Sequence, residues 1–157
     1  MATTVGYFQI INPQVADWLG GLTANAADTL RNGLLAKLNS AGKLVVCSAD
    51  DRSSGIAWSN RTKVYAPTSA YLAADEEVTL ATGHIRALVD SSFFYTQTLP
   101  GFAALLYTAA GGLMDTNGAA AGFVGKVIKT SEDVRDLPNT TKTVVMVELE
   151  FDGRNMV

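Results

Sequence analysis

The chain has 157 residues, of which 48% are apolar and 17% are charged, and its formal net charge is −3. This length fits one domain with a sizeable core, and the acidic balance argues against a nucleic-acid-binding protein, since those proteins generally carry a basic face. The charged fraction lies well below the roughly 25% of a typical soluble domain. It predicts that part of the surface contacts another protein.

Two residue types that occur once each limit the chemistry further. Cys47 is the one cysteine and His84 the one histidine, which excludes an internal disulfide and argues against a zinc site. No apolar run approaches the roughly 20 residues of a membrane-spanning helix. The opening residues MATTVGYFQ lack the basic and apolar parts of a signal peptide, so we expect a protein that stays or assembles in a reducing cytoplasm.

Residues 1–27 form a segment that is poor in charge and irregular in pattern. Asn12-Pro13 predicts the start of a short helical turn, and Gly20-Gly21 its end. The segment is too apolar for a free tail, and two interpretations are open: it folds over the core of its own chain, or it is an arm that docks on a neighbouring molecule. Its large apolar residues are the candidates for partner binding: Tyr7, Phe8, Ile10, Ile11 and Trp18.

Residues 28–157 are predicted to form a β-rich domain, because short apolar runs alternate with turns of Asn, Ser, Asp and Gly. The apolar run KLVVCSA predicts a packed thiol at Cys47. Residues 78–89 alternate imperfectly, and Gly83 marks a bulge or a close backbone approach. Helical periodicity is weak and confined to residues 22–38, where Asn32 and Gly33 interrupt it. The class is therefore mainly β.

The last strand, TKTVVMVELEF, carries the clearest pattern. The residues DLPNT, which precede the strand, are predicted to form a turn. Glu148 and Glu150 are predicted to point outward. The residues that alternate with them are predicted to form one inward face: Thr143, Val145, Val147, Leu149 and Phe151.

The glycine-rich stretch 101–130 presents a choice between a phosphate-binding loop and the turns of a β-protein. Gly125-Lys126 is followed by Val127, where a Walker A loop needs Ser or Thr, and the residues continue as a β-branched strand. Gly111-Gly112 and Asn117-Gly118 instead match hairpin turns, one closing a hairpin and one opening another. The stretch is therefore interpreted as architecture.

Candidate catalytic and metal-binding groups are few. His84 has serines nearby in sequence but no nucleophile elbow, and the acidic run 75–77 lacks the spaced pattern of a calcium loop. Glu148 and Glu150 lie about 7 Å apart along one strand face, which could suit paired-carboxylate hydrolysis, but edge charges that deter aggregation are favoured. We expect no catalytic, cofactor-binding or metal-binding residues, and a protein that is not an enzyme.

Four stretches together carry a resemblance to a known family: residues 33–58 (GLLAKL to GIAW), 78–89 (VTLATGHIRALV), 99–128 (LPGFAALLY to GKVI) and 143–151 (TVVMVELEF). Their order of turns and strands resembles that of the small head decoration, or cement, proteins of tailed bacteriophages. The resemblance covers residues 28–151. It implies a compact β-barrel, β-tulip-like or sandwich domain that forms a homotrimer on the capsid surface of the virion, binds the major capsid protein and lays residues 1–27 on the shell as an arm. It implies no cofactor, nucleic acid or membrane.

Other function classes stay open beside this one. The long apolar N-terminal segment also suits another virion component, such as a minor capsid, tail or spike protein. A carbohydrate-binding β-sandwich would need aromatic side chains exposed along one groove, and the candidates are Trp58, Tyr65, Tyr71 and Tyr107. A hydrolase subunit would use Glu148 and Glu150.

Overall fold

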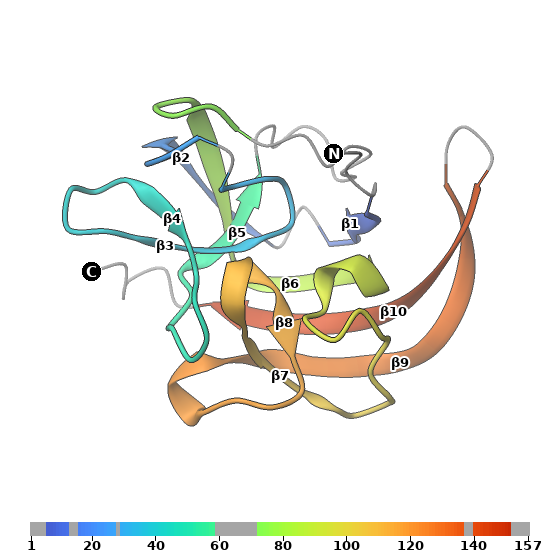
Figure 1. Cartoon of the computed structure of the whole chain (residues 1–157). Coiled ribbons are helices and arrows are strands. Elements are labelled where there is room, and N and C mark those ends of the chain that lie inside the picture. Colours follow the sequence, from blue (N-terminus) through green and yellow to red (C-terminus); the bar gives the residue numbers. More distant parts are fainter. Residues whose placement is uncertain (1–5, 13–15, 28, 59–71, 137–139, 152–157) are drawn as a thin grey trace.

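The computed structural model describes residues 6–12, 16–27, 29–58, 72–136 and 140–151. In these ranges the predicted β class is confirmed: ten strands in antiparallel pairs form a sheet that curls into a half-barrel (Figure 1). The strands are β1 (Phe8–Ile10), β2 (Asp17–Thr23), β3 (Leu35–Leu38), β4 (Leu44–Val46), β5 (Gly55–Trp58), β6 (Glu77–Asp90), β7 (Leu105–Thr108), β8 (Met114–Asp115), β9 (Phe123–Asp136) and β10 (Thr140–Phe151). Three short 3-10 helices accompany them: η1 (Ser91–Phe93), η2 (Ala110–Gly112) and η3 (Ala120–Gly122).

Strand β6 organises the sheet, because it is long enough to carry different partners at its two ends. Along residues 77–82 it pairs with β2 and, through residues 79–81, with β5. Along residues 83–90 it pairs with β10 and, through residues 87–89, with β1. The strand order β4-β3-β5-β6-β10-β9-β7-β8 therefore passes through β6, and β1 and β2 branch from it.

Gly83 lies where the partners of β6 change, and its close neighbour is the side chain of Asp17, not the backbone approach or bulge that the sequence predicts. Its φ of +77° falls in the left-handed region that glycine adopts without steric cost. A Cβ at this position would lie 2.9 Å from the Asp17 carboxylate oxygen on β2. A glycine inside a strand permits a tight bend, so the residue lets one strand serve both parts of the curled sheet.

The N-terminal segment belongs to this sheet over its described residues, since β1 and β2 both pair with β6. The predicted helix end at Gly20-Gly21 is wrong: both glycines lie inside β2, where the register shifts between Leu19 and Leu22. The start of that turn rests on Pro13, which lies outside the described residues. The weak helical periodicity of residues 22–38 is also not realised, because this stretch holds the end of β2, a connection and β3.

The closing strand confirms most of its predicted inward face. Val145, Val147 and Leu149 are fully buried, and Phe151 is 5% exposed. Thr143 is exposed, contrary to the prediction, because the pairing of β10 with β6 begins only at the next residue, Val144. Shifts of register between residues 144 and 147 break the strict alternation and bury Val144 as well.

The glycine-rich stretch packs strands and turns closely. Gly125 lies opposite Leu149 across β9 and β10, where a Cβ would collide with the carbonyl oxygen of Glu148. Gly111-Gly112 connects β7 to β8 with positive φ at both residues, which confirms the predicted hairpin turn. Asn117-Gly118 does not open a second hairpin, because β8 and β9 both pair with β7 and not with each other.

Aromatic side chains centre the larger of two core clusters. The ring of Phe8 packs against Trp58 and Phe93, with centroids 5.8 and 5.2 Å away. Cys47 lies in the same cluster and is fully buried, which confirms the packed thiol. Burial raises the pKa of this thiol to about 12, so it is protonated at neutral pH. The smaller cluster lies between β3, β4, β5 and the first half of β6.

Replacing Leu149 by alanine is expected to lower the free energy of unfolding by about 2–5 kcal/mol, because a fully buried side chain is lost and a cavity remains. Urea denaturation of the purified variant measures this change. Glu150→Ala is the matched control, since Glu150 is exposed on the same strand and its loss is expected to cost about 0.5 kcal/mol or less. Equal midpoints for the two variants would contradict the described orientation of β10.

Candidate functional surface

A row of charged side chains crosses the outer face of the sheet from β6 to β9. Glu148 on β10 is in register with Arg86 on β6 and with Lys126 on β9. Arg86 Nε lies 3.3 Å from Glu148 Oε2, and His84 Nε2 lies 3.8 Å from the same oxygen. Glu150 is exposed opposite His84. Glu148 is therefore part of a surface ion-pair network, and the two carboxylates occupy one face, as predicted.

Beyond Lys126 the outer face becomes apolar. Leu105 on β7 is in register with Lys126, and Tyr107 points to the same side two residues later. The Tyr107 ring packs edge-to-face against Phe123 at the start of β9, with centroids 5.7 Å apart. Leu105 is 48% exposed and Phe123 is 50% exposed. Together with Phe102, these residues are called the apolar surface below.

The local sequence of β7 explains why these side chains are exposed. In LLYT, Leu106 and Thr108 point inward and are buried, so Leu105 and Tyr107 must face outward. Phe102 is 67% exposed and precedes β7 in a turn whose next residue, Ala103, donates its N–H to the Val127 carbonyl. Large side chains therefore occupy both faces of this strand, and the described residues cover only the face of Leu106 and Thr108.

Small residues border the apolar surface. Gly118 lies against the Tyr107 side chain, and residues 119–121 are exposed alanines. The side chains of these small residues have almost no rotamer entropy to lose when a partner covers them. Two acidic residues adjoin them: Asp115 is in register with Tyr107, and Asp50 accepts the Ala119 N–H at 2.8 Å. Large aromatic side chains are typical of the centre of a protein–protein interface, and the charged row is suited to its polar rim.

The five candidate partner-binding residues of the N-terminal segment do not form a surface together. Phe8 and Ile10 are fully buried and Tyr7 is 6% exposed, because β1 covers the end of β6 and places them in the core. Ile11 is 37% exposed, and Trp18 is half-buried. For residues 7–10, the described conformation is therefore the alternative in which the segment folds over its own core, and these three side chains are not available to a partner.

The acidic residues of two loops have turn roles. In the run 75–77, Asp75 pairs with Lys43, and Glu76 accepts a hydrogen bond from the Ala73 N–H at 2.7 Å. In the other loop, Asp51 Oδ2 lies 2.7 Å from Lys37 Nζ and accepts the Ser48 N–H at 2.8 Å. Burial alone would raise the pKa of Asp51, but the hydrogen bonds and the charge of Lys37 outweigh it and lower the pKa below the usual 3.8.

The aromatic groove of a carbohydrate-binding module does not form from its predicted residues. Trp58 is fully buried in the core, and Tyr107 belongs to the apolar surface. Tyr65 and Tyr71 lie outside the described residues. A hollow lined by Phe94, Thr96, Thr98, Pro100, Asp115 and Thr116 holds about 80 Å³, well below the roughly 300 Å³ from which ligand pockets start.

Comparison with known proteins gives no relative: no family model, no curated protein and no solved structure matches the chain. Within the described ranges, no three His, Cys, Asp or Glu side chains come together as a metal site would require. None of the helices in those ranges has the length and apolar character needed to cross a membrane.

Sequence reasoning did not single out Phe102, Leu105 or Phe123. A signal for them exists in LPGFAALLYT, where large apolar residues occupy both alternating positions of a strand. A strand of this kind needs cover on both faces. Whether residues of the same chain cover the second face depends on how the sheet curls. The local sequence pattern does not indicate this.

Substituting Glu148 by glutamine is expected to change the free energy of unfolding by about 0.5 kcal/mol or less, because the carboxylate takes part in a surface ion-pair network. Thermal unfolding of the variant beside Arg86→Gln, which removes the other side of the same pair, tests this. A loss of several kcal/mol would contradict the surface ion-pair assignment, whereas the loss of an enzymatic activity would favour the hydrolase alternative.

The pKa of Asp51 predicts a pH-dependent contribution to stability. Because this pKa is lower in the folded state, the contribution is fully present above pH 3.8 and disappears as the pH falls through the folded pKa. Asp51→Asn is therefore expected to be less stable than the wild type at pH 7, by under about 1 kcal/mol for this partly exposed pair. Urea denaturation at pH 7 and near pH 2.5 measures the gap, which should narrow at the lower pH; a constant gap would contradict the assignment.

Proposed function

We propose that this chain is a virion structural protein that decorates an assembled bacteriophage head and stabilises its shell. The observation that carries the proposal is the apolar surface: Leu105 and Phe123 are 48% and 50% exposed beside Tyr107, and Phe102, which is 67% exposed, precedes β7 in the chain. Monomeric soluble proteins rarely expose contiguous apolar area of this kind without a partner. The turn-and-strand resemblance to head decoration proteins supplies the identity of the partner, the major capsid protein.

A decoration protein stabilises by mass action: it binds the assembled shell and not the free shell subunits, so the assembled state gains the binding free energy. This role needs a broad complementary surface and no reaction chemistry. In the proposed arrangement the apolar surface contacts the shell, with Phe102 and Phe123 as anchors. The charged row from Lys126 to Arg86 lies at the rim of this interface. The same resemblance favours a homotrimer at the three-fold positions of the shell.

This proposal is tested by measuring whether the protein binds heads of the bacteriophage whose genome encodes it. We expect the wild type to co-sediment with assembled heads, not with unassembled shell subunits, and to raise the temperature at which the heads release DNA. Substituting Phe102 and Phe123 together by serine is expected to weaken head binding by about 100-fold or more, since central aromatic anchors contribute most of the binding energy. The variant should stay folded with only a small drop in melting temperature, because Phe102 is 67% exposed and Phe123, which is 50% exposed, loses one edge-to-face contact with Tyr107.

Ile11→Ser is the matched control, because Ile11 is an exposed apolar residue of the N-terminal segment, outside the apolar surface. It is expected to bind heads like the wild type. If Ile11→Ser abolished binding and the double phenylalanine variant did not, the N-terminal segment would be the docking element. If the wild type ignored heads but copurified with tails or spikes, the chain would be another virion component.

A further inference from the structure

The chain contains the dipeptide Asn-Gly twice, at Asn32-Gly33 and at Asn117-Gly118. Asparagine is a thermolabile residue, because the backbone nitrogen that follows it can attack its side-chain carbonyl carbon. Glycine in the next position hinders this attack least, since it has no Cβ and its backbone is permissive. The attack also needs a backbone that can move, so the fold decides which of the two asparagines reacts.

The first dipeptide is held by the core. The Gly33 N–H donates a hydrogen bond to the Ala57 carbonyl at 3.0 Å, so the nitrogen that would attack is already engaged. Gly33 is buried, and a Cβ at this position would lie 2.6 Å from the ring of Phe93. Moving the Gly33 nitrogen toward the Asn32 side chain would break a buried hydrogen bond and disturb the close packing around it.

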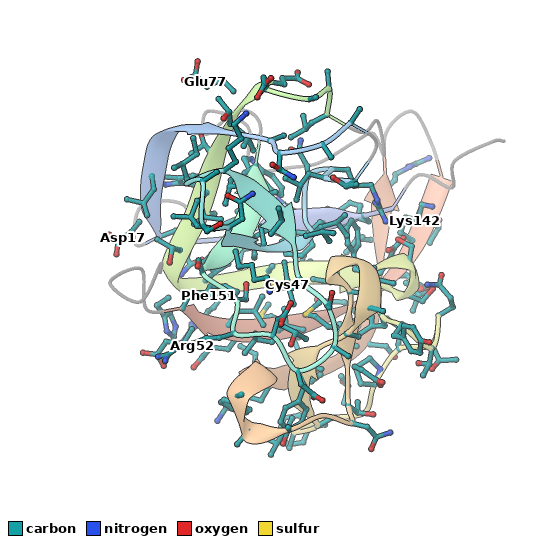
Figure 2. All side chains as sticks on the ribbon, turned by 60° about the vertical axis from the view of Figure 1, so that its left-hand side comes forward. Asp17, Cys47, Arg52, Glu77, Lys142 and Phe151 are labelled. Carbon is teal, nitrogen blue, oxygen red and sulfur yellow. The ribbon has the colours of Figure 1, made fainter. Side chains whose placement is uncertain are left out.

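The second dipeptide lies at the surface, between β8 and η3, and this connection is at the lower end of the molecule in Figure 2. Asn117 and Gly118 are both exposed. The N–H groups on either side are engaged: that of Thr116 donates to Asp115 Oδ1 at 2.7 Å, and that of Ala119 to Asp50 Oδ1 at 2.8 Å. Within the described part of the chain, the Gly118 N–H has no hydrogen-bond acceptor.

Packing, and not turn geometry, requires glycine at position 118. The φ angle of Gly118 lies outside the left-handed region, and Asn117-Gly118 does not close a hairpin. A Cβ at this position would instead lie 2.4 Å from the Cβ of Tyr107. The tyrosine of the apolar surface therefore keeps, directly after Asn117, the residue that hinders cyclisation least.

We propose that Asn117 deamidates spontaneously in the folded protein. The Gly118 nitrogen loses its proton to water and forms a bond to Asn117 Cγ. The bond from Cγ to the side-chain nitrogen breaks, and that nitrogen takes up a proton and leaves as ammonia. Water then opens the cyclic imide at either carbonyl, which gives aspartate or isoaspartate. Both products add a negative charge close to Asp115 and Asp50, at the border of the apolar surface.

The experiment follows both dipeptides by mass spectrometry of proteolytic fragments while the purified protein is kept at neutral pH without heads. Fragments with Asn117 are expected to acquire the mass of the acid about ten-fold faster or more than fragments with Asn32, because Asn32-Gly33 must first open locally. In urea that unfolds the protein, the two rates are expected to be similar. Equal rates in the folded protein, an intact Asn117, or the same preference in urea would overturn the proposal.

Asn117→Gln is the matched control, because it keeps the amide but would have to close a larger ring. The acid is not expected to appear in this fragment, and a mass change that persists there would overturn the assignment to Asn117. Because Asn117 is exposed, the variant should fold like the wild type.

The added charge also bears on head binding, a consequence that rests on the proposed function whereas the reaction itself does not. Asn117→Asp carries the charge of the product, and it is expected to bind heads about two- to ten-fold less tightly than the wild type. Unchanged binding would overturn this consequence. A wild type that deamidates at Asn117 but ignores heads would instead overturn the proposed function.

Discussion

The two edges of β6 hold the described fold together. One edge pairs with β2 and then β1, and the other pairs with β5 and then β10, so a single strand joins every part of the sheet. The partners of β6 change at Gly83, where the backbone has a positive φ and no Cβ stands against Asp17, which permits a bend between the two halves of the strand. The buried face of β10, the position of β9 and the exposure of β7 all follow from where this bend directs the second half of β6.

The curl of the sheet also determines which apolar residues find cover. Inside, one register row crosses β6, β10, β9 and β7 through Ile85, Leu149, Gly125 and Leu106, and its three leucine and isoleucine side chains are fully buried. Outside, Leu105, Tyr107 and Phe123 have the same apolar character but no covering layer among the described residues. The free energy that favours burying them is therefore available to a partner. This is the physical reason for proposing a docking role, and the low charge content of the chain agrees with it.

The sequence by itself determined the β class, the hairpin at Gly111-Gly112, the buried thiol of Cys47 and the inward face from Val145 to Phe151. These depend on interactions within a few residues: two-residue alternation, turn chemistry and local hydrophobicity. Thr143 departs from its pattern because pairing with β6 stops at Val144, which β10 alone cannot indicate. Only the tertiary structure decided that Phe8, Ile10 and Trp58 are core residues, and that Leu105 and Phe123 are exposed. In the sequence, an apolar residue that a distant strand covers looks the same as one that a partner protein covers. Which of the two applies depends on strand pairings between residues some 80 positions apart, such as Phe8 with Val89.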